Sequence, residues 1–421
     1  MISLTPLFAR LVRTEAFLLQ HAELWQPAPF HQTPDWVLRH PDLYDALIAL
    51  TDAQCERLEH DSTALAHWLG QYQETLTEIP ALIALPRAHS ARKKPWPTGF
   101  EWDVPGRKWA QIENFVAALT PRTATLVDWC AGKGHLSRSV AFQHERPIIA
   151  LEWDLHLCDA AEQLSHKHHT PVTPIRQDVL DTSAADHITR DRHCIALHAC
   201  GKLHLQLMRL ASQKQAPALS ISPCCYHLID TSTYTPLSPV APALLPQRLV
   251  LTRDQLRLAV QETVTANGHA RRLRDRKSAW RLGFRQWVQS HWPTAKITFP
   301  SLPDRCFHGN FDDFCRHMLA HVTPPPDSET TGDSVASLQS HFDSSERMQY
   351  EQAGWTAYRQ VQRLELVRHG FRRVLELWLC LDRACWLETQ GYDITLSEFC
   401  APQVTPRNLL IDAVRSPRRP P

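Results

Sequence analysis

Between Leu126 and Ser137 the chain reads Leu-Val-Asp-Trp-Cys-Ala-Gly-Lys-Gly-His-Leu-Ser, a short apolar run that ends in an acid and continues into a glycine turn. Glycine is scarce, with 13 in 421 residues, so two glycines within three positions (Gly132 and Gly134) carry information. Glycines after a strand let backbone N–H groups approach a ligand, and the start of the following helix favours its anionic end. The segment predicts a strand, a ligand-binding turn and a helix.

Four further apolar segments follow at spacings typical of β/α alternation. The first expected strand is 125–128, and the four further segments are 148–152, 172–178, 194–198 and 218–222. Helix-compatible segments separate most of them. Short apolar strands joined by crossovers of this length indicate a parallel, doubly wound α/β sheet. The handedness of such crossovers places the carboxyl ends of all five strands at one edge of the sheet.

The rest of the chain is expected to surround and complete this core. Residues 1–95 read as a helical N-terminal extension, and residues 96–245 as the Rossmann-like core. Residues 246–355 read as a helical, basic insertion with a flexible loop at 323–345. Residues 356–416 predict one long helix, whose apolar positions run from Leu364 to Cys385, and an antiparallel strand pair that completes the sheet.

Composition excludes several classes of protein. The chain has 45 basic and 44 acidic residues, so any attraction to a polyanion must come from a local patch. No apolar run reaches the ~18 residues of a membrane span, and charges interrupt the N-terminal segment where an export signal would be apolar. Twelve cysteines spread over 421 residues are typical of reduced thiols. We therefore expect a cytoplasmic protein with no membrane partner.

Three acids at expected strand tips indicate the ligand. Glu152 is placed to accept hydrogen bonds from ribose hydroxyls, Asp178 from an adenine amine, and Asp128 from the ammonium group of a methionine moiety. A dinucleotide loop would have a third glycine where this chain has Ser137, and a Walker loop would have Gly-Lys-Ser/Thr. The pattern favours S-adenosylmethionine, held by these acids with Gly132 and Gly134. A ligand-free turn and an NAD-linked oxidoreductase are the alternatives.

Four segments resemble class I S-adenosylmethionine-dependent methyltransferases: Leu126–Ser137, Leu151–Asp154, Leu197–Gly201 and Cys224–His227. More narrowly, the chain is similar to the methyltransferase-domain family marked by His-x-Cys-Gly and Cys-Cys-Tyr-His. That family includes the methyltransferase-like 25 group and the methyltransferase module of the glutathione S-transferase C-terminal-domain-containing protein. Eukaryotic tRNA 2′-O-ribose methyltransferases are also similar, although they carry Cys-Cys-His-His where this chain has Cys-Cys-Tyr-His. The resemblance covers roughly 105–230 and implies a class I sheet.

The fourth and fifth strand ends should lie beside the reacting methyl group. Methyl transfer to oxygen or nitrogen depends on positioning and can require a base. We predict that the catalytic residues are His198, Tyr226 and His227. Together with Cys200, Cys224 and Cys225, the two histidines are also suitable zinc ligands. Because the side chains of adjacent cysteines usually diverge, we expect packing roles for these thiols and no metal.

A basic segment in the insertion suggests the methyl acceptor. On a helix, one face would carry Arg274, Lys277, Arg281 and Arg285, and a neighbouring face would carry Trp280 and Trp287 as packing anchors. The cations predict phosphate contacts with RNA, or else form a solvated helix face. The expected function is therefore methylation of RNA. The alternatives are a protein or small-molecule methyltransferase and a non-catalytic binding module of the same fold.

Overall fold

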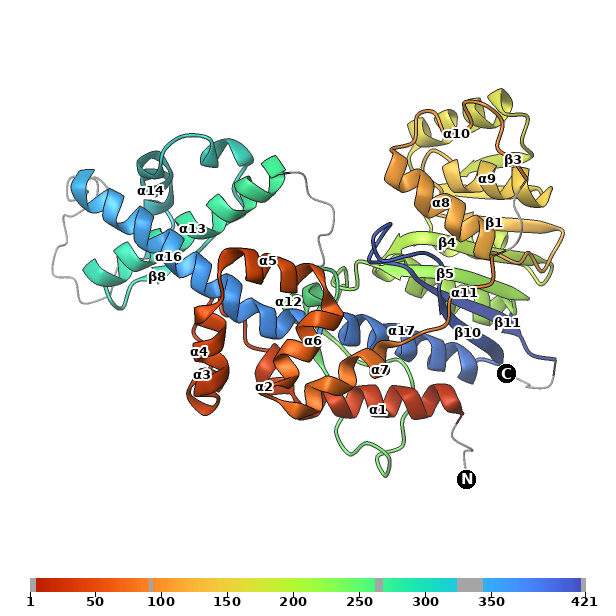
Figure 1. The fold of residues 1–421 in the computed structure, drawn as a ribbon. Coiled ribbons are helices and arrows are strands. Elements are labelled where there is room, and N and C mark those ends of the chain that lie inside the picture. The colour runs from red at the N-terminus through yellow and green to blue at the C-terminus, as the bar shows by residue number, and fades with distance from the viewer. Residues whose placement is uncertain (1–4, 91–93, 262–267, 324–343, 418–421) are drawn as a thin grey trace. The chain divides into compact units, whose positions relative to one another are not determined.

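The computed structural model describes residues 5–90, 94–261, 268–323 and 344–417 (Figure 1). The chain forms two compact units, each built from segments that are distant in sequence. Unit 1 comprises Met1–Ala22, Glu78–Val264 and Phe371–Pro421, and unit 2 comprises Glu23–Thr77 and Thr265–Gly370. The boundaries expected for the N-terminal extension (1–95) and the insertion (246–355) do not coincide with these units. Helices of both segments are shared between unit 1 and unit 2. None of the helices in the described ranges has the length and apolar character needed to cross a membrane.

Unit 1 contains a seven-stranded sheet in the order β10-β11-β5-β4-β1-β2-β3. The strands β1 to β5 are parallel, and β11 pairs antiparallel with both β5 and β10. This order confirms the predicted doubly wound sheet with a C-terminal hairpin. The strands are β1 (Thr125–Trp129), β2 (Ile148–Glu152), β3 (Val172–Arg176), β4 (Arg192–Cys200), β5 (Ala218–Cys224), β10 (Tyr392–Glu398) and β11 (Leu409–Arg415).

Helices cover both faces of the sheet (Figure 1). The helices α8 (Gly106–Ala118), α9 (His135–His144) and α10 (Leu155–Lys167) lie on one face, and α11 (Lys202–Lys214) and α17 (Arg372–Thr389) lie on the other. Apolar side chains of α8, α9, β1 and β2 form one continuous core. The smaller elements of this unit are α7 (Ile79–Ile83), η2 (Thr182–His187), β6 (Thr233–Tyr234), β7 (Leu251–Thr252) and α12 (Arg253–Leu258).

The first helix, α1 (Pro6–Gln20), belongs to the sheet unit because it packs on α17. The carboxylate of Glu15 on α1 is completely buried and accepts hydrogen bonds from Arg248 Nε, the Leu249 backbone N–H and Trp378 Nε1, at 2.9, 2.7 and 3.1 Å. Buried carboxylates require such partners, so this contact anchors α1 to α17.

Unit 2 is built mainly from helices. Its apolar core gathers the aromatic side chains of α13 and α14, and both Trp280 and Trp287 are buried in it, which confirms them as packing anchors. Its elements are α2 (Ala22–Trp25, which begins one residue earlier), α3 (Trp36–Arg39), α4 (Pro41–Ala49), α5 (Asp52–His60), α6 (Ser62–Gly70), η1 (Glu74–Glu78, which ends one residue later), α13 (Gly268–His291), β8 (Lys296–Ile297), η3 (Asp304–Phe307), α14 (Phe311–Leu319), β9 (Val322–Thr323) and α16 (Ser344–His369).

Two glycines allow α13 and α16 to approach closely. A Cβ atom on Gly283 would lie 2.5 Å from Tyr350 O, and one on Gly354 would lie 2.4 Å from Ala279 O.

The prediction of a single long helix from Leu364 to Cys385 was wrong, because α16 ends at His369 and α17 begins at Arg372. Most of the loop expected at 323–345 falls on residues 324–343, outside the described ranges.

Candidate active site

The glycine turn after β1 has the backbone that its sequence predicts. Cys130, Gly132 and Gly134 all have left-handed φ values, of 64°, 58° and 68°, and Gly134 precedes α9. A Cβ atom on Gly132 would meet nothing within 4 Å, whereas one on Gly134 would lie 3.0 Å from Ala161 Cβ of α10. The turn is therefore open at Gly132, where a ligand can approach, and packed against the protein at Gly134.

Glu152 joins the tip of β2 to this turn. Its Oε2 accepts a hydrogen bond from the Gly132 N–H at 2.8 Å, and its Oε1 accepts from the N–H groups of Trp153 and Asp154 at 3.0 and 3.2 Å. A carboxylate has about four lone-pair sites, so it retains capacity for a ligand hydroxyl. The side chain is largely buried, so its hydrogen bonds are shielded from water.

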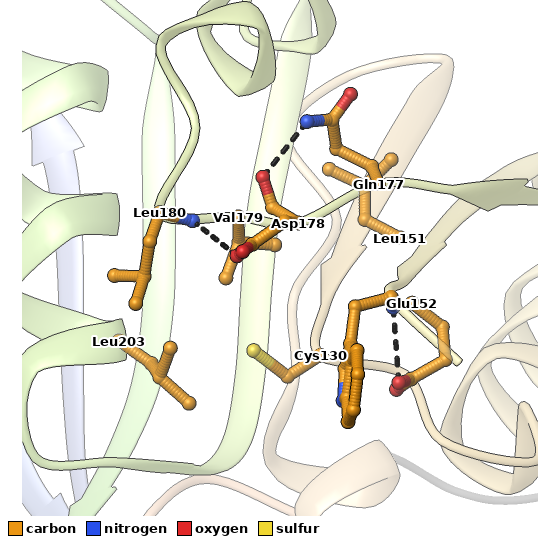
Figure 2. A pocket seen from close by; sticks show the side chains of 9 residues that line it. Cys130, Leu151, Glu152, Gln177, Asp178, Val179, Leu180 and Leu203 are labelled. Carbon is orange, nitrogen blue, oxygen red and sulfur yellow. Dashed lines mark hydrogen bonds between the residues drawn. The ribbon is translucent and has the colours of Figure 1, made fainter.

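A cavity of about 310 Å³ opens between Glu152 and Asp178 (Figure 2). The Asp178 carboxylate is oriented by the Leu180 N–H, which donates to Oδ1 at 2.9 Å. The remaining lining residues are mostly apolar: Cys130, Leu151, Trp153, Gln177, Val179, Leu180 and Leu203. Acids beside apolar walls suit a nucleoside, whose ring is apolar and whose hydroxyl and amine groups donate hydrogen bonds. The structure thus brings Gly132, Glu152 and Asp178 together as predicted.

Sequence reasoning did not identify the apolar walls of this cavity. Leu180 follows Asp178 by two residues, and Leu203 lies in the first turn of α11, so neither belongs to the glycine motif or to a strand tip. The one signal for Leu203 was its position just after the His-Ala-Cys-Gly segment that ends at Gly201.

Asp128 lies at the end of β1 but is buried beneath the turn. Its Oδ2 accepts a hydrogen bond from Ser137 Oγ at 2.6 Å, and burial raises the pKa of its carboxyl to about 7. It does not line the cavity between Glu152 and Asp178. Its predicted role toward a methionine ammonium group stays a prediction.

His198 occupies an irregular part of β4. Its φ is 65°, and the pairing of β4 with β5 shifts register between Leu197 and Cys200. His198 Nε2 donates to Gln111 Oε1 of α8 at 2.8 Å, a tautomer that leaves Nδ1 as an acceptor. Burial, together with the nearby charges of Arg407 and Lys108, lowers the pKa of His198 to about 4. The imidazole is therefore neutral at pH 7.

Tyr226 and His227 differ in their surroundings. Tyr226 is completely buried, with its hydroxyl 3.3 Å from Pro223 O and 3.2 Å from Cys380 Sγ, and with the Arg383 guanidinium 5.0 Å from its ring centre. These are packing contacts, and its catalytic role stays a prediction. His227 is partly exposed, and its Nδ1 is buried without a hydrogen-bond partner among the described residues.

A second cavity, of about 340 Å³, lies beside the ends of β4 and β5. Leu203 lines both this cavity and the one at Glu152. Its charged walls are Lys202 and Asp230, which form an ion pair with Nζ and Oδ1 3.0 Å apart. The other lining residues are Cys200, Leu228 and Ile229. The two cavities that meet at Leu203 have suitable positions for a cofactor and for its reaction partner.

The four predicted RNA-binding cations all lie on α13, in unit 2. Arg281 and Arg285 are about half buried and donate to the backbone oxygens of Pro300 and Phe30 at 3.3 and 2.5 Å. Lys277 pairs with Asp304, with Nζ and Oδ1 2.6 Å apart. Arg274 is the most exposed of the four, with 48% of its side chain accessible to solvent.

Residues 107–232 match the family described as "Methyltransferase domain". Solved structures with similarity to this chain include three that are 13–16% identical to it in sequence over the aligned residues. An O-methyltransferase family protein from Burkholderia thailandensis is 16% identical with a TM-score of 0.23, and the match covers 38% of this chain and 52% of that one. This chain thus spans about half the length of that protein.

The cyclopropane synthase MmaA2 from Mycobacterium tuberculosis is 13% identical, with 89% of this chain and 97% of that one covered and a TM-score of 0.25. Coclaurine N-methyltransferase, bound to N-methylheliamine and SAH, is 13% identical, with 86% and 95% covered and a TM-score of 0.24. Residues 107–232 match the methyltransferase-domain family, and this match together with the sheet order indicates a class I S-adenosylmethionine-dependent methyltransferase domain.

Proposed function

We propose that this domain transfers the methyl group of S-adenosylmethionine to RNA, with the adenosine moiety in the cavity between Glu152 and Asp178. Glu152 would accept hydrogen bonds from the ribose hydroxyls, Asp178 from the adenine amine, and Asp128 would face the ammonium group. Supporting this, the cavity combines two oriented carboxylates with apolar walls. The cofactor supplies an electrophilic methyl group, and the residues of the chain bind it and orient the acceptor.

The observation that favours a polyanionic acceptor is the positive charge around His198. Arg407 and Lys108 are close enough to this imidazole to lower its pKa, whereas Lys202 in the neighbouring cavity is already paired with Asp230. Positive charge around an apolar pocket attracts phosphate groups. A neutral His198 with Nδ1 as an acceptor is suited to take a proton from an attacking hydroxyl or amine.

The cations of α13 are proposed as additional RNA contacts. Arg274 and Lys277 are expected to contribute most, because Arg281 and Arg285 are half buried against backbone carbonyls. Binding through phosphates releases counterions, so the logarithm of the affinity should fall with the logarithm of salt concentration by ~0.7 for each contacted phosphate on a single strand.

The decisive experiment supplies the full chain with tritium-methyl S-adenosylmethionine and with fractionated RNA and protein. Label should enter the RNA fraction, and the salt slope of RNA binding should fall by up to ~1.4 in an Arg274→Gln/Lys277→Gln variant, by about 0.7 per lost contact on a single strand. An Arg257→Gln variant is the control, since Arg257 is an exposed cation on α12, in unit 1. Label in the protein fraction, or in neither, would shift the conclusion to a protein or small-molecule acceptor. A chain that binds no cofactor would indicate a non-catalytic module.

We also propose that the protein works in the cytoplasm. In support, all twelve cysteines are free thiols, as expected of a chain that folds in a reducing compartment. Quantitative thiol alkylation of the protein in intact cells tests this, and protected, disulfide-linked cysteines would contradict it.

A further inference from the structure

Three cysteine thiols converge where β4 and β5 end. Cys200 is paired in register with Cys224, and the two Sγ atoms lie 3.5 Å apart. Cys225 is the next residue along the chain, and its Sγ lies within 4.8 Å of both other sulfur atoms. These are the only three residues in the described ranges whose potential metal-ligand atoms gather in this way.

An unusual backbone brings the two adjacent thiols to the same side. Side chains of neighbouring residues normally diverge, which was the reason to expect no metal here. Cys225, however, has a left-handed φ of 49°, and β4 is irregular just before Cys200. A left-handed backbone is strained for a non-glycine residue, and such strain often accompanies a binding or catalytic site. Here the left-handed backbone at Cys225 lets the thiols of Cys224 and Cys225 both face Cys200.

The positions of the three sulfur atoms suit a tetrahedral ion. A zinc–sulfur distance of about 2.3 Å implies sulfur atoms about 3.8 Å apart. The Sγ atoms of Cys200 and Cys224 lie 3.5 Å apart, and all three sulfur atoms lie within 4.8 Å of one another. Thiolates are soft ligands that select zinc over magnesium or calcium. The set therefore needs small side-chain rotations and no movement of the sheet.

One candidate for a fourth ligand is His227, two residues after Cys225. Its ring nitrogens lie outside the group of three sulfur atoms that are within 4.8 Å of one another, so coordination requires the imidazole to move toward them. His227 Nδ1 is buried and has no hydrogen-bond partner among the described residues, which is costly for a polar atom. Coordination would satisfy the Nδ1 lone pair.

We propose that Cys200, Cys224 and Cys225 bind one zinc ion, with His227 Nδ1 as the fourth ligand. Binding exchanges the thiol protons for the metal, and those protons pass to solvent. The ion would join the ends of β4 and β5 and hold one wall of the cavity lined by Cys200. This inference does not depend on RNA being the acceptor.

The test is metal analysis of the full chain, purified without chelator and in the presence of reductant. The parent is expected to contain one zinc ion per chain, and Cys224→Ser and Cys225→Ser are expected to lose most of it. Cys306→Ser is the matched control, because Cys306 is a partly exposed cysteine in unit 2 outside the cluster. After zinc is exchanged for cobalt, the thiolate-to-metal absorption of each single cysteine variant should be lower than that of the parent by the contribution of one thiolate. His227→Ala should keep that absorption but bind cobalt at least about tenfold more weakly.

Several results would overturn the proposal. One is a folded parent chain, shown by circular dichroism and S-adenosylhomocysteine binding, that contains no zinc and gives no thiolate–cobalt absorption. Another is full zinc content in Cys225→Ser. A disulfide between Cys200 and Cys224 in the metal-free parent would assign the cluster to redox chemistry instead. Unchanged cobalt affinity in His227→Ala would remove His227 from the ligand set. Cofactor binding is measured separately, so failure of the zinc site and failure of the proposed transferase function are distinguishable.

Discussion

Replacing Glu152 with alanine is expected to weaken cofactor binding by about 1.5–3 kcal/mol. Hydrogen bonds to a charged group contribute about that much, and Glu152 is the acid placed to receive the ribose hydroxyls. The dissociation constant of S-adenosylmethionine or S-adenosylhomocysteine should therefore rise about 10- to 150-fold. The variant also removes the acceptor for the Gly132 N–H, so loosening of the glycine turn acts in the same direction.

Isothermal titration calorimetry measures this effect, with thermal unfolding to confirm that the variant is folded. Glu152→Gln keeps the shape of the side chain but loses the charge, so it should fall between the parent and the alanine variant. Glu162→Ala is the matched control, because Glu162 is an exposed acid on α10 with no contact to the cavity. A Glu152→Ala variant that binds within twofold of the parent would show that the ribose lies elsewhere.

Three further predictions concern stability and turnover. Gly354→Ala should lower the free energy of unfolding by about 1–3 kcal/mol, because its Cβ would press on a carbonyl of α13, whereas Gly106→Ala, in open space, should change it by less than ~1 kcal/mol in denaturant titrations. Burial lowers the pKa of His193 and His204 to about 3. Their contribution to stability is therefore fully present above pH ~6.5 and is lost as the pH falls toward 3, by about 1.4 kcal/mol per pH unit for each. Melting curves of His193→Gln should show a shallower acid slope, and an unchanged slope would contradict this assignment. His198→Asn should reduce turnover far more than cofactor affinity, and a parallel fall in both would place His198 against the cofactor.

The sheet was predictable because its signals are local. Each of the five parallel strands is a short apolar run, and the spacing between runs leaves room for one crossover helix. The division into two units was not predictable in the same way. Glu15 is anchored through contacts with residues more than 200 positions away, and no local pattern announces such partners. The break between α16 and α17 was missed because their apolar positions continue in register across Gly370.

The candidate site was predictable at its strand tips and less so elsewhere. Gly132, Glu152 and Asp178 meet because parallel strand ends share an edge. The burial of Tyr226 depends on Arg383 of α17, a distant helix, so its sequence motif alone suggested an accessible hydroxyl. The convergence of adjacent thiols depends on the left-handed φ of Cys225, which a non-glycine residue adopts only in a specific tertiary context.

The location of the cofactor is the central claim, and a crystal structure of the full chain with S-adenosylhomocysteine tests it most directly. We predict that the ribose hydroxyls lie within hydrogen-bond distance of the Glu152 carboxylate. The adenine ring should lie beside Asp178 and Leu180, in the cavity of about 310 Å³. Ligand density elsewhere on unit 1, with this cavity empty at saturating ligand, would contradict the assignment of the site.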